Sequence, residues 1–383
     1  MRLRPDLQLE RFQAEVRDHV TAAMTPELEQ TIYTTGVFHD AGFTRGLAEK
    51  GWYASDLSGG ERLGPLQTQI LIAELHRADA PMYLGETTRM VASVIRQVGT
   101  PFVRERVLDG VARGEVTIAL GFSEPECGSD VAAASTRAVP DGDDWLINGS
   151  KMFTTNGHIA DYVFLLARTD PSVPKHKGLT MFLVPTNTDG FDAQAVWTLS
   201  GERTNITFYS DLRLSDRWRI GDVNAGWQVL LLALEDEHAS GWGPHIARLL
   251  HHAESWALNT TDASGNTRLS DPDVRRRLAR VATEVEVSTL LLSRCAWMDE
   301  TGQTATAEGS MSKLFSTEAL ERASQDINEM VGPDALRNHF EPTAPENGRI
   351  QQIMRFSLGT TIYAGTSEVQ RTIIAQRGLG LPR

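Results

Sequence analysis

The spacing of apolar residues predicts helices over the first third of the chain. Residues 9–23 carry apolar side chains at helical spacing among Glu, Arg and Asp. Residues 65–76 repeat that pattern after Pro65, a residue suited to the first turn of a helix. The same periodicity continues over residues 88–98 and 101–111. We therefore expect this part of the chain to be helical.

A block of short strand-like runs follows from about residue 116. Its apolar runs cover residues 145–147, 162–167, 179–184 and 206–209. The turn-forming pairs Asp141-Gly142, Asn148-Gly149 and Asn156-Gly157 punctuate them, and Asn-Gly is a strong signal for a tight hairpin. We expect a hairpin at Asn148-Gly149, followed by a strand that carries Phe153 and two threonines.

Helical periodicity returns at Gly226 and lasts almost to the end of the chain. A long amphipathic helix is expected over residues 274–297, after a polar loop, and residues 333–347 read as irregular. The order is helices, a small β block, then helices. It predicts an α+β protein with three domains, with an N-terminal helical domain over 1–117, a β domain over 118–222 and a C-terminal helical domain over 223–383.

Composition narrows the classes of partner. The net charge of -13 disfavours nucleic acid and anionic lipid as general partners. Cys127 and Cys295 lie far apart, so they form neither a disulfide framework nor a metal motif, and a reducing, cytoplasmic setting is expected. The beginning of the chain lacks the apolar core of a signal peptide, and the longest apolar run, residues 229–234, is too short to span a membrane.

Three segments carry the candidate chemistry. Taken alone, the polar loop Gly121–Asp130 and the segment Ile147–Gly157 are ordinary turns. Together and in this order they resemble two flavin-binding strands of the acyl-CoA dehydrogenases, whose signatures are Thr-Glu-Pro before Gly-Ser-Asp, and Asn-Gly, one residue, Lys. A third segment, Ile362–Arg371, resembles that family's Tyr-Glu-Gly-Thr loop and the helix after it.

The resemblance implies a fold and a cofactor. The fold is an N-terminal helical bundle, a small β-barrel-like domain and a C-terminal four-helix bundle, with FAD between subunits. The residues carried over as FAD contacts are Phe122, Ser123, Ser129, Phe153, Thr155, Gly332 and Thr366. Ser123 replaces the usual threonine, and Phe153 stands where a tryptophan usually covers the flavin ring. No metal site is implied.

The same resemblance implies α,β-desaturation of an acyl-CoA thioester, with a base at Cα and hydride transfer from Cβ to flavin N5. Many members place the base just before the Gly-Thr pair, where this chain has Ala364. A minority place it on a helix, in the pattern Leu-Asp-x-Glu-Arg, and residues 234–238 read Leu-Glu-Asp-Glu-His. We therefore expect Glu237 to be the base, as in related actinobacterial enzymes for branched, bulky or steroid acyl groups.

Departures from the family leave the assembly open. Residues 259–266 lack the Arg and Phe of the family's second FAD half-site, and Pro333 follows Gly332 where a second glycine is usual. A homo- or hetero-tetramer is expected, with an electron-transferring flavoprotein as the electron acceptor. Two alternatives remain: a non-catalytic partner subunit, and a tailoring desaturase that acts on a carrier-protein thioester.

Overall fold

The computed structural model describes residues 6–237 and 242–382. The side chains of Ser58 and of residues 235–237 also lie outside the described part. The chain divides into two compact units. The sheet unit comprises Thr25–Leu63 and Pro81–Glu237, and the helical unit comprises Met1–Met24, Gly64–Ala80 and His238–Arg383. Each is described by itself.

The sheet unit is built on one eight-stranded sheet with the order β6-β7-β3-β2-β4-β5-β8, and β1 pairs with β4 outside that path. Neighbouring strands are mostly antiparallel, but β4 pairs in parallel with both β1 and β2. The strands are β1 (Ile118–Gly121), β2 (Arg137–Asp141), β3 (Asp144–Lys151), β4 (Tyr162–Arg168), β5 (Leu179–Pro185), β6 (Phe191–Trp197), β7 (Arg203–Ser215) and β8 (Arg219–Ile220).

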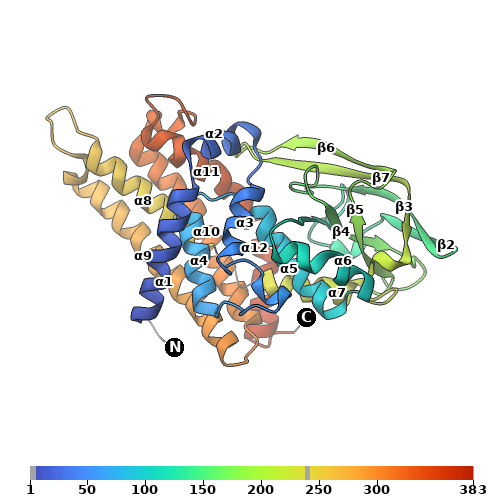
Figure 1. Cartoon of the computed structure of the whole chain (residues 1–383). Coiled ribbons are helices and arrows are strands. Elements are labelled where there is room, and N and C mark those ends of the chain that lie inside the picture. Colours follow the sequence, from blue (N-terminus) through green and yellow to red (C-terminus); the bar gives the residue numbers. More distant parts are fainter. Residues whose placement is uncertain (1–5, 238–241, 383) are drawn as a thin grey trace. The chain divides into compact units, whose positions relative to one another are not determined.

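Strands β4 and β5 are buried on both faces, which explains their continuous apolar sequences. One face contributes Val163, Leu165 and Phe182 to the main apolar cluster of the sheet. The helices of the unit are α2 (Pro26–Thr35), α3 (Ala41–Glu49), α5 (Tyr83–Val98), α6 (Pro101–Ala112) and α7 (Gly226–Glu237). Helix α7 packs against β4 and β5, and α5 packs against β1 (Figure 1).

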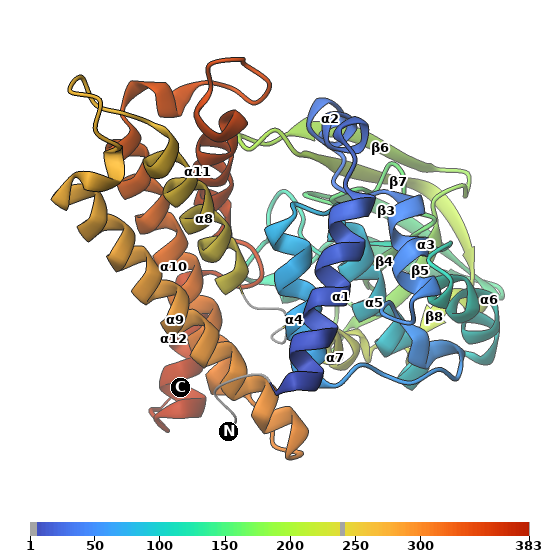
Figure 2. The same ribbon diagram turned by 60° about the vertical axis from the view of Figure 1, so that its left-hand side comes forward.

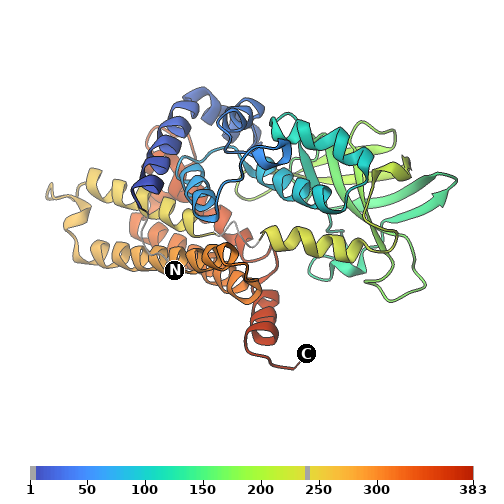
Figure 3. The same cartoon turned by 60° about the horizontal axis from the view of Figure 1, so that its bottom comes forward.

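The helical unit joins early and late parts of the chain. Helix α1 (Leu7–Ala23) packs on α4 (Pro65–Arg77), and α4 packs on α8 (Gly243–Asn259) and α9 (Pro272–Glu300). Helices α10 (Thr306–Val331) and α11 (Arg349–Thr360) complete the bundle with α8 and α9, and α12 (Ser367–Ile373) packs on α10 (Figures 2 and 3).

A buried carboxylate joins the two early helices of this unit. The side chain of Glu74, on α4, is 3% exposed. It accepts hydrogen bonds from Gln13 and Arg17 of α1, at 2.8 and 2.6 Å, and from Arg77, at 2.7 Å. Burial raises the pKa of Glu74, but its bonds to Arg17, Arg77 and Gln13 outweigh that effect and hold the pKa below its ordinary value. The Gln69 amide also donates to the Leu292 carbonyl, at 2.7 Å, so α4 is tied to α9.

The predicted order of helices, β block and helices is confirmed. Proline begins α4 as expected and also begins α6, and the Thr100 hydroxyl caps α6 by accepting from the Val103 N–H. The domain boundaries at 117/118 and 222/223 stay a prediction. In the described part of the chain, no helix combines the length and the apolarity that crossing a membrane requires.

One local prediction was wrong. The β2–β3 hairpin turns at Gly142 and Asp143, and Asn148-Gly149 lies within β3. There Gly149 forms an irregularity opposite β7 with a φ of 147°, and an added Cβ would lie 2.7 Å from Thr136 Cα. Glycine is needed at this point for close approach of two backbones, and not for a turn. Residues 152–156 are correspondingly a loop and not the expected strand.

Candidate functional site

Two loops of the sheet unit lie side by side and carry five of the predicted contact residues. One loop follows β1 and contains Phe122, Ser123 and Ser129, and the other follows β3 and contains Phe153 and Thr155. The Met152 N–H donates a 2.8 Å hydrogen bond to the Ser123 carbonyl, which fixes one loop against the other. The two sequence segments singled out above are therefore brought together by the fold.

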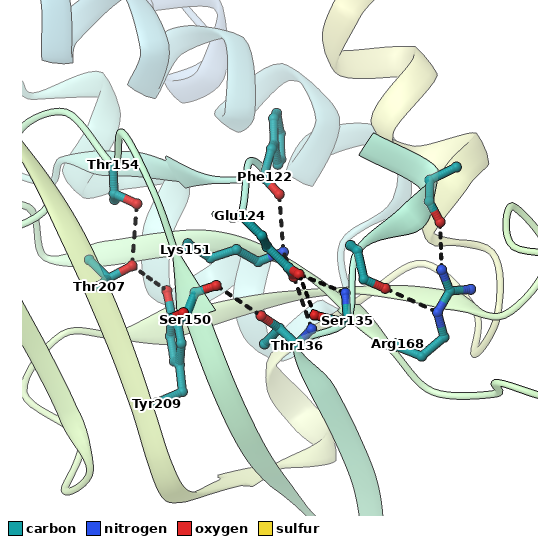
Figure 4. A network of polar contacts seen from close by, with 12 residues as sticks. Phe122, Glu124, Ser135, Thr136, Ser150, Lys151, Thr154, Arg168, Thr207 and Tyr209 are labelled. Carbon is teal, nitrogen blue, oxygen red and sulfur yellow. Dashed lines mark hydrogen bonds and ion pairs between the residues drawn. The ribbon is translucent and has the colours of Figure 1, made fainter. Parts of the chain in front are cut away.

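A buried ion pair joins the bases of the two loops (Figure 4). The Lys151 ammonium, at the end of β3, lies 2.8 Å from Glu124 Oε1 and donates to the Phe122 carbonyl at 3.1 Å. The side chains of Lys151 and Glu124 are 0% and 3% exposed. Glu124 also accepts from the N–H and hydroxyl of Ser135, both at 2.7 Å, and from the Thr136 N–H at 2.9 Å. The carboxylate is thus fully hydrogen-bonded.

The electrostatics of this pair favour its ionised form. Burial raises the pKa of Glu124, but the charge and hydrogen bond of Lys151 and the donors of Ser135 outweigh burial and lower the pKa to about 2. Burial lowers the pKa of Lys151, and the charge of Glu124 opposes that effect without fully cancelling it. A buried charge with a partner and a complete set of hydrogen bonds is tolerated where a lone one is not.

The remainder of the first loop is held by backbone groups. Glu124 and Cys127 exchange two backbone hydrogen bonds, at 2.8 and 3.1 Å. The Arg168 guanidinium of β4 donates to the carbonyls of Ala132 and Ala134. Ser129 lies between these two anchors and is exposed. The loop therefore presents a hydroxyl on a fixed backbone.

Phe153 is held in an uncommon conformation. Its φ is 60°, a left-handed value that costs a non-glycine residue energy, and its side chain is 61% exposed. The neighbouring residues are pinned, because the Met152 N–H donates to Ser123 and the Thr154 N–H donates to the Asn205 carbonyl at 2.9 Å. The surrounding structure thus compels the backbone to turn and directs an aromatic ring into solvent.

The base of the second loop is polar and ordered. The Thr155 hydroxyl lies 3.1 Å from the Thr204 hydroxyl, and the Thr154 hydroxyl lies 3.2 Å from that of Thr207. The Asn205 amide donates to the Thr154 carbonyl at 3.0 Å. Strand β7 therefore supports this loop from below through side chains, which the sequence pattern did not indicate.

The other predicted residues belong to the helical unit. Thr366 caps α12 by accepting from the Val369 N–H, and it lines a pocket of about 420 Å³ with residues of α10 and α12. Ala364 has a φ of 55°, and the Lys313 ammonium donates to the Gly365 carbonyl at 2.7 Å. Gly332 ends α10 at φ 82° and ψ -157°, a conformation open essentially to glycine alone.

Glu237 is the last residue of α7, and its side chain lies outside the described residues. Its backbone position still places it at the C-terminal end of a helix. Within residues 6–237 and 242–382, no three His, Cys, Asp or Glu side chains gather as a metal ion would need.

Sequence reasoning did not assign roles to Glu124 and Lys151, although both lay within the quoted motifs. The available signal was a lysine directly before the apolar pair Met152 and Phe153, together with a glutamate in the other loop. A charge in such a position requires a buried partner. Asn205 and Thr207, also missed, carried no signal in the sequence alone.

Comparison with known families identifies all three parts of the chain. The N-terminal, middle and C-terminal domains of acyl-CoA dehydrogenases match residues 7–115, 119–216 and 224–379. Acyl-CoA dehydrogenase FadE26 of Mycobacterium tuberculosis is 34% identical, with 100% of this chain and 99% of the relative covered. Acyl-CoA dehydrogenase FadE29 of the same organism is 33% identical, with 85% and 83% covered.

Solved structures agree with these matches. The ChsE4-ChsE5 complex from Mycobacterium tuberculosis has a chain with a TM-score of 0.91 at 33% identity, and coverage is 100% of both chains. The Tcur3481-Tcur3483 steroid acyl-CoA dehydrogenase gives 0.91 at 30% identity, again over 100% of both chains. The chain therefore belongs to the acyl-CoA dehydrogenase family, whose members are oxidoreductases acting on CH–CH bonds.

Proposed function

We propose that this chain holds the flavin ring of FAD against the loops after β1 and β3 and desaturates an acyl thioester between Cα and Cβ. The family is FAD-dependent. The observation that supports the proposal is that two adjoining loops, fixed against each other, present unpaired hydrogen-bond donors beside an exposed aromatic ring. Among the described residues, neither the N–H nor the hydroxyl of Ser123 has a hydrogen-bond partner, and the Phe153 ring on the adjacent loop is exposed.

These residues fit the ring half of the cofactor. A flavin offers hydrogen-bond acceptors along one edge and a flat aromatic face, which match the Ser123 donors and the Phe153 ring. We propose further contacts from the Phe122 backbone, the exposed Ser129 hydroxyl and Thr155. Gly332 and Thr366 of the helical unit complete the set of proposed cofactor contacts.

The segment that stands at the family's nucleotide half-site fits less well. In the loop after α8, the Ser264 and Asn266 N–H groups both donate to the Asp262 carboxylate, at 2.8 and 3.0 Å. Those donors are therefore occupied, and the carboxylate would repel a phosphate. Pro333, next to Gly332, has no N–H to offer. We therefore favour a heteromer in which a partner chain supplies the nucleotide half.

Proton abstraction falls to this chain's own residues. Bound FAD would supply the acceptor for the hydride that leaves Cβ. We propose Glu237 as the base at Cα, because Ala364 has no group that can take a proton.

Replacement of Glu237 by Gln tests the base. We expect turnover of an acyl-CoA with a dye acceptor to fall by about 100-fold or more, while the bound flavin, read from its visible absorbance, stays constant. Glu235→Gln, on the same helix, is the matched control. Wild-type turnover by Glu237→Gln would refute the assignment.

The acyl group and the partners are also proposals. The Tcur3481-Tcur3483 protein is a steroid acyl-CoA dehydrogenase, and the ChsE4-ChsE5 relative is a complex of two proteins. We propose a branched or bulky acyl-CoA as substrate, a hetero-tetramer as the assembly and an electron-transferring flavoprotein as the acceptor. A panel of acyl-CoA esters on the co-expressed complex tests the substrate, and its visible absorbance against that of the isolated chain tests the assembly.

A second candidate function is that of a non-catalytic partner subunit. Ala364 and the altered nucleotide segment are also what a non-catalytic partner subunit would carry. In that case Glu237→Gln would leave the turnover of the assembled complex unchanged, whereas loss of turnover would exclude it.

A further inference from the structure

Of the five backbone polar groups from the Phe122 carbonyl to the Glu124 carbonyl, four have a hydrogen-bond partner and one does not. The Phe122 carbonyl accepts from Lys151 at 3.1 Å, and the Ser123 carbonyl accepts from the Met152 N–H at 2.8 Å. The Glu124 N–H and carbonyl are both bonded to Cys127. In the part of the chain that the structure describes, the Ser123 N–H alone among these groups lacks a partner.

Peptide geometry connects Lys151 with that N–H. The peptide between Phe122 and Ser123 is planar and trans, so its C=O and N–H point in opposite directions. A donor that holds the carbonyl therefore also fixes the direction of the N–H. Lys151 holds this carbonyl from the buried interior, and its ammonium is kept in place by Glu124 at 2.8 Å. The free N–H consequently faces away from Lys151.

The cost of burying two charges indicates that the Lys151–Glu124 ion pair does more than stabilise the fold. A buried ion pair is often no more stable than apolar side chains of the same volume, because both charges must leave water. Apolar residues could fill the space between the two loops, but they could not hold the Phe122 carbonyl. The Lys151 donor is the component that an apolar pair would lack.

We propose that Lys151 is a positioning residue for the flavin: through the Phe122 carbonyl it fixes the peptide plane that presents the Ser123 N–H to the cofactor, and Glu124 anchors it. The proposal rests on the proposed function, because it assigns the flavin ring to this loop. A hydrogen bond from a fixed N–H polarises the flavin edge, so the absorption spectrum of the bound flavin should report the direction of the peptide.

The test uses the full chain, with its partner if one is needed for flavin binding. Lys151→Met keeps the length of the side chain and removes the donor. Lys151→Met/Glu124→Gln also removes the unpaired carboxylate that the single change leaves behind. The control is Glu74→Gln, which alters a buried carboxylate with three hydrogen-bonding partners in the helical unit.

Three quantities are measured: the thermal midpoint, the dissociation constant of FAD, and the visible absorption spectrum of the bound flavin. We expect Lys151→Met to weaken FAD binding about tenfold or more, which is about 1.4 kcal/mol, and to shift the spectrum. The double variant should regain thermal stability but keep the weak binding and shifted spectrum. Glu74→Gln should lower the midpoint and leave both flavin readouts unchanged.

The proposal would be overturned if the double variant regained normal FAD binding and spectrum, or if all variants lost FAD in proportion to stability. Hydrogen exchange of residues 119–136 in the flavin-free protein separates this proposal from the proposed function. If the wild-type assembly binds no flavin, the proposed function fails. The positioning role is then tested by hydrogen exchange alone: this loop should exchange faster in both Lys151 variants and at the wild-type rate in Glu74→Gln, and any other result overturns it.

Discussion

Protonation of Glu124 should account for a distinct part of the acid sensitivity of the sheet unit. The carboxyl has a pKa of about 2 in the folded chain, against an ordinary value of 4.5. Because the folded pKa is the lower one, the stabilisation is complete above about pH 4.5 and is lost as the pH falls toward 2. At 1.36 kcal/mol per pH unit, this difference corresponds to about 3 kcal/mol. That value is at the lower end of the range for breaking a buried ion pair, about 3–5 kcal/mol.

Glu124→Gln isolates this contribution because it keeps the shape of the side chain and removes its charge. We expect the variant to be less stable than the wild type by about 3 kcal/mol at pH 7, and the difference to shrink toward zero near pH 2. The assay is urea unfolding at a series of pH values, followed by intrinsic tryptophan fluorescence, to which Trp145 in the sheet core contributes. A wild-type-to-variant difference that stays constant between pH 7 and pH 3 would refute the reasoning.

Two further substitutions test the backbone of the site. Phe153→Gly should relieve the left-handed strain and raise the stability of the flavin-free chain by up to about 1 kcal/mol in thermal melts, while flavin titration shows weaker binding; a loss of stability would mean that the ring packs onto the fold. Gly149→Ala should destabilise the sheet unit by about 1–3 kcal/mol, because the new methyl group meets the Thr136 backbone at a positive φ; an unchanged melting temperature would show that the strands can separate without cost.

The sequence allowed the order of the elements to be predicted because long periodic segments are insensitive to context. Helices α4 and α6 begin at prolines, and the apolar runs of β4 and β5 are long enough to be recognised. The β6 strand was not predicted, because none of its residues is buried and its sequence has no long apolar run. The prediction for Asn148-Gly149 was wrong because an Asn-Gly pair occurs both in hairpin turns and where two backbones approach closely. Here the glycine is required by the nearby backbone of Thr136, which the local sequence does not reveal.

The candidate site could be predicted from the sequence only as two motifs. Each of them falls on one of the adjoining loops, but the contacts that hold the loops depend on distant residues. Lys151 meets Glu124 across 27 residues of chain, and Asn205 meets Thr154 across 51. Such pairings depend on which strands are neighbours in the sheet, and the spacing of apolar residues along the sequence does not reveal this. Glu237 remains a prediction from resemblance.

The helical unit is assembled from three separate stretches of chain, and this has a consequence for biosynthesis. Helices α1 and α4 leave the ribosome long before α8 and α9, which cover the apolar face of α4. Until those later helices emerge, the apolar face of α4 stays exposed to solvent. Exposed apolar surface makes a nascent chain prone to aggregate. The last residue of the sheet unit is Glu237, so this unit can fold before α8 and α9 are synthesised. Less of the nascent chain is then unfolded while the helical unit is incomplete. Expression at low temperature or with chaperones should therefore raise the yield of this chain more than that of a protein whose domains are contiguous.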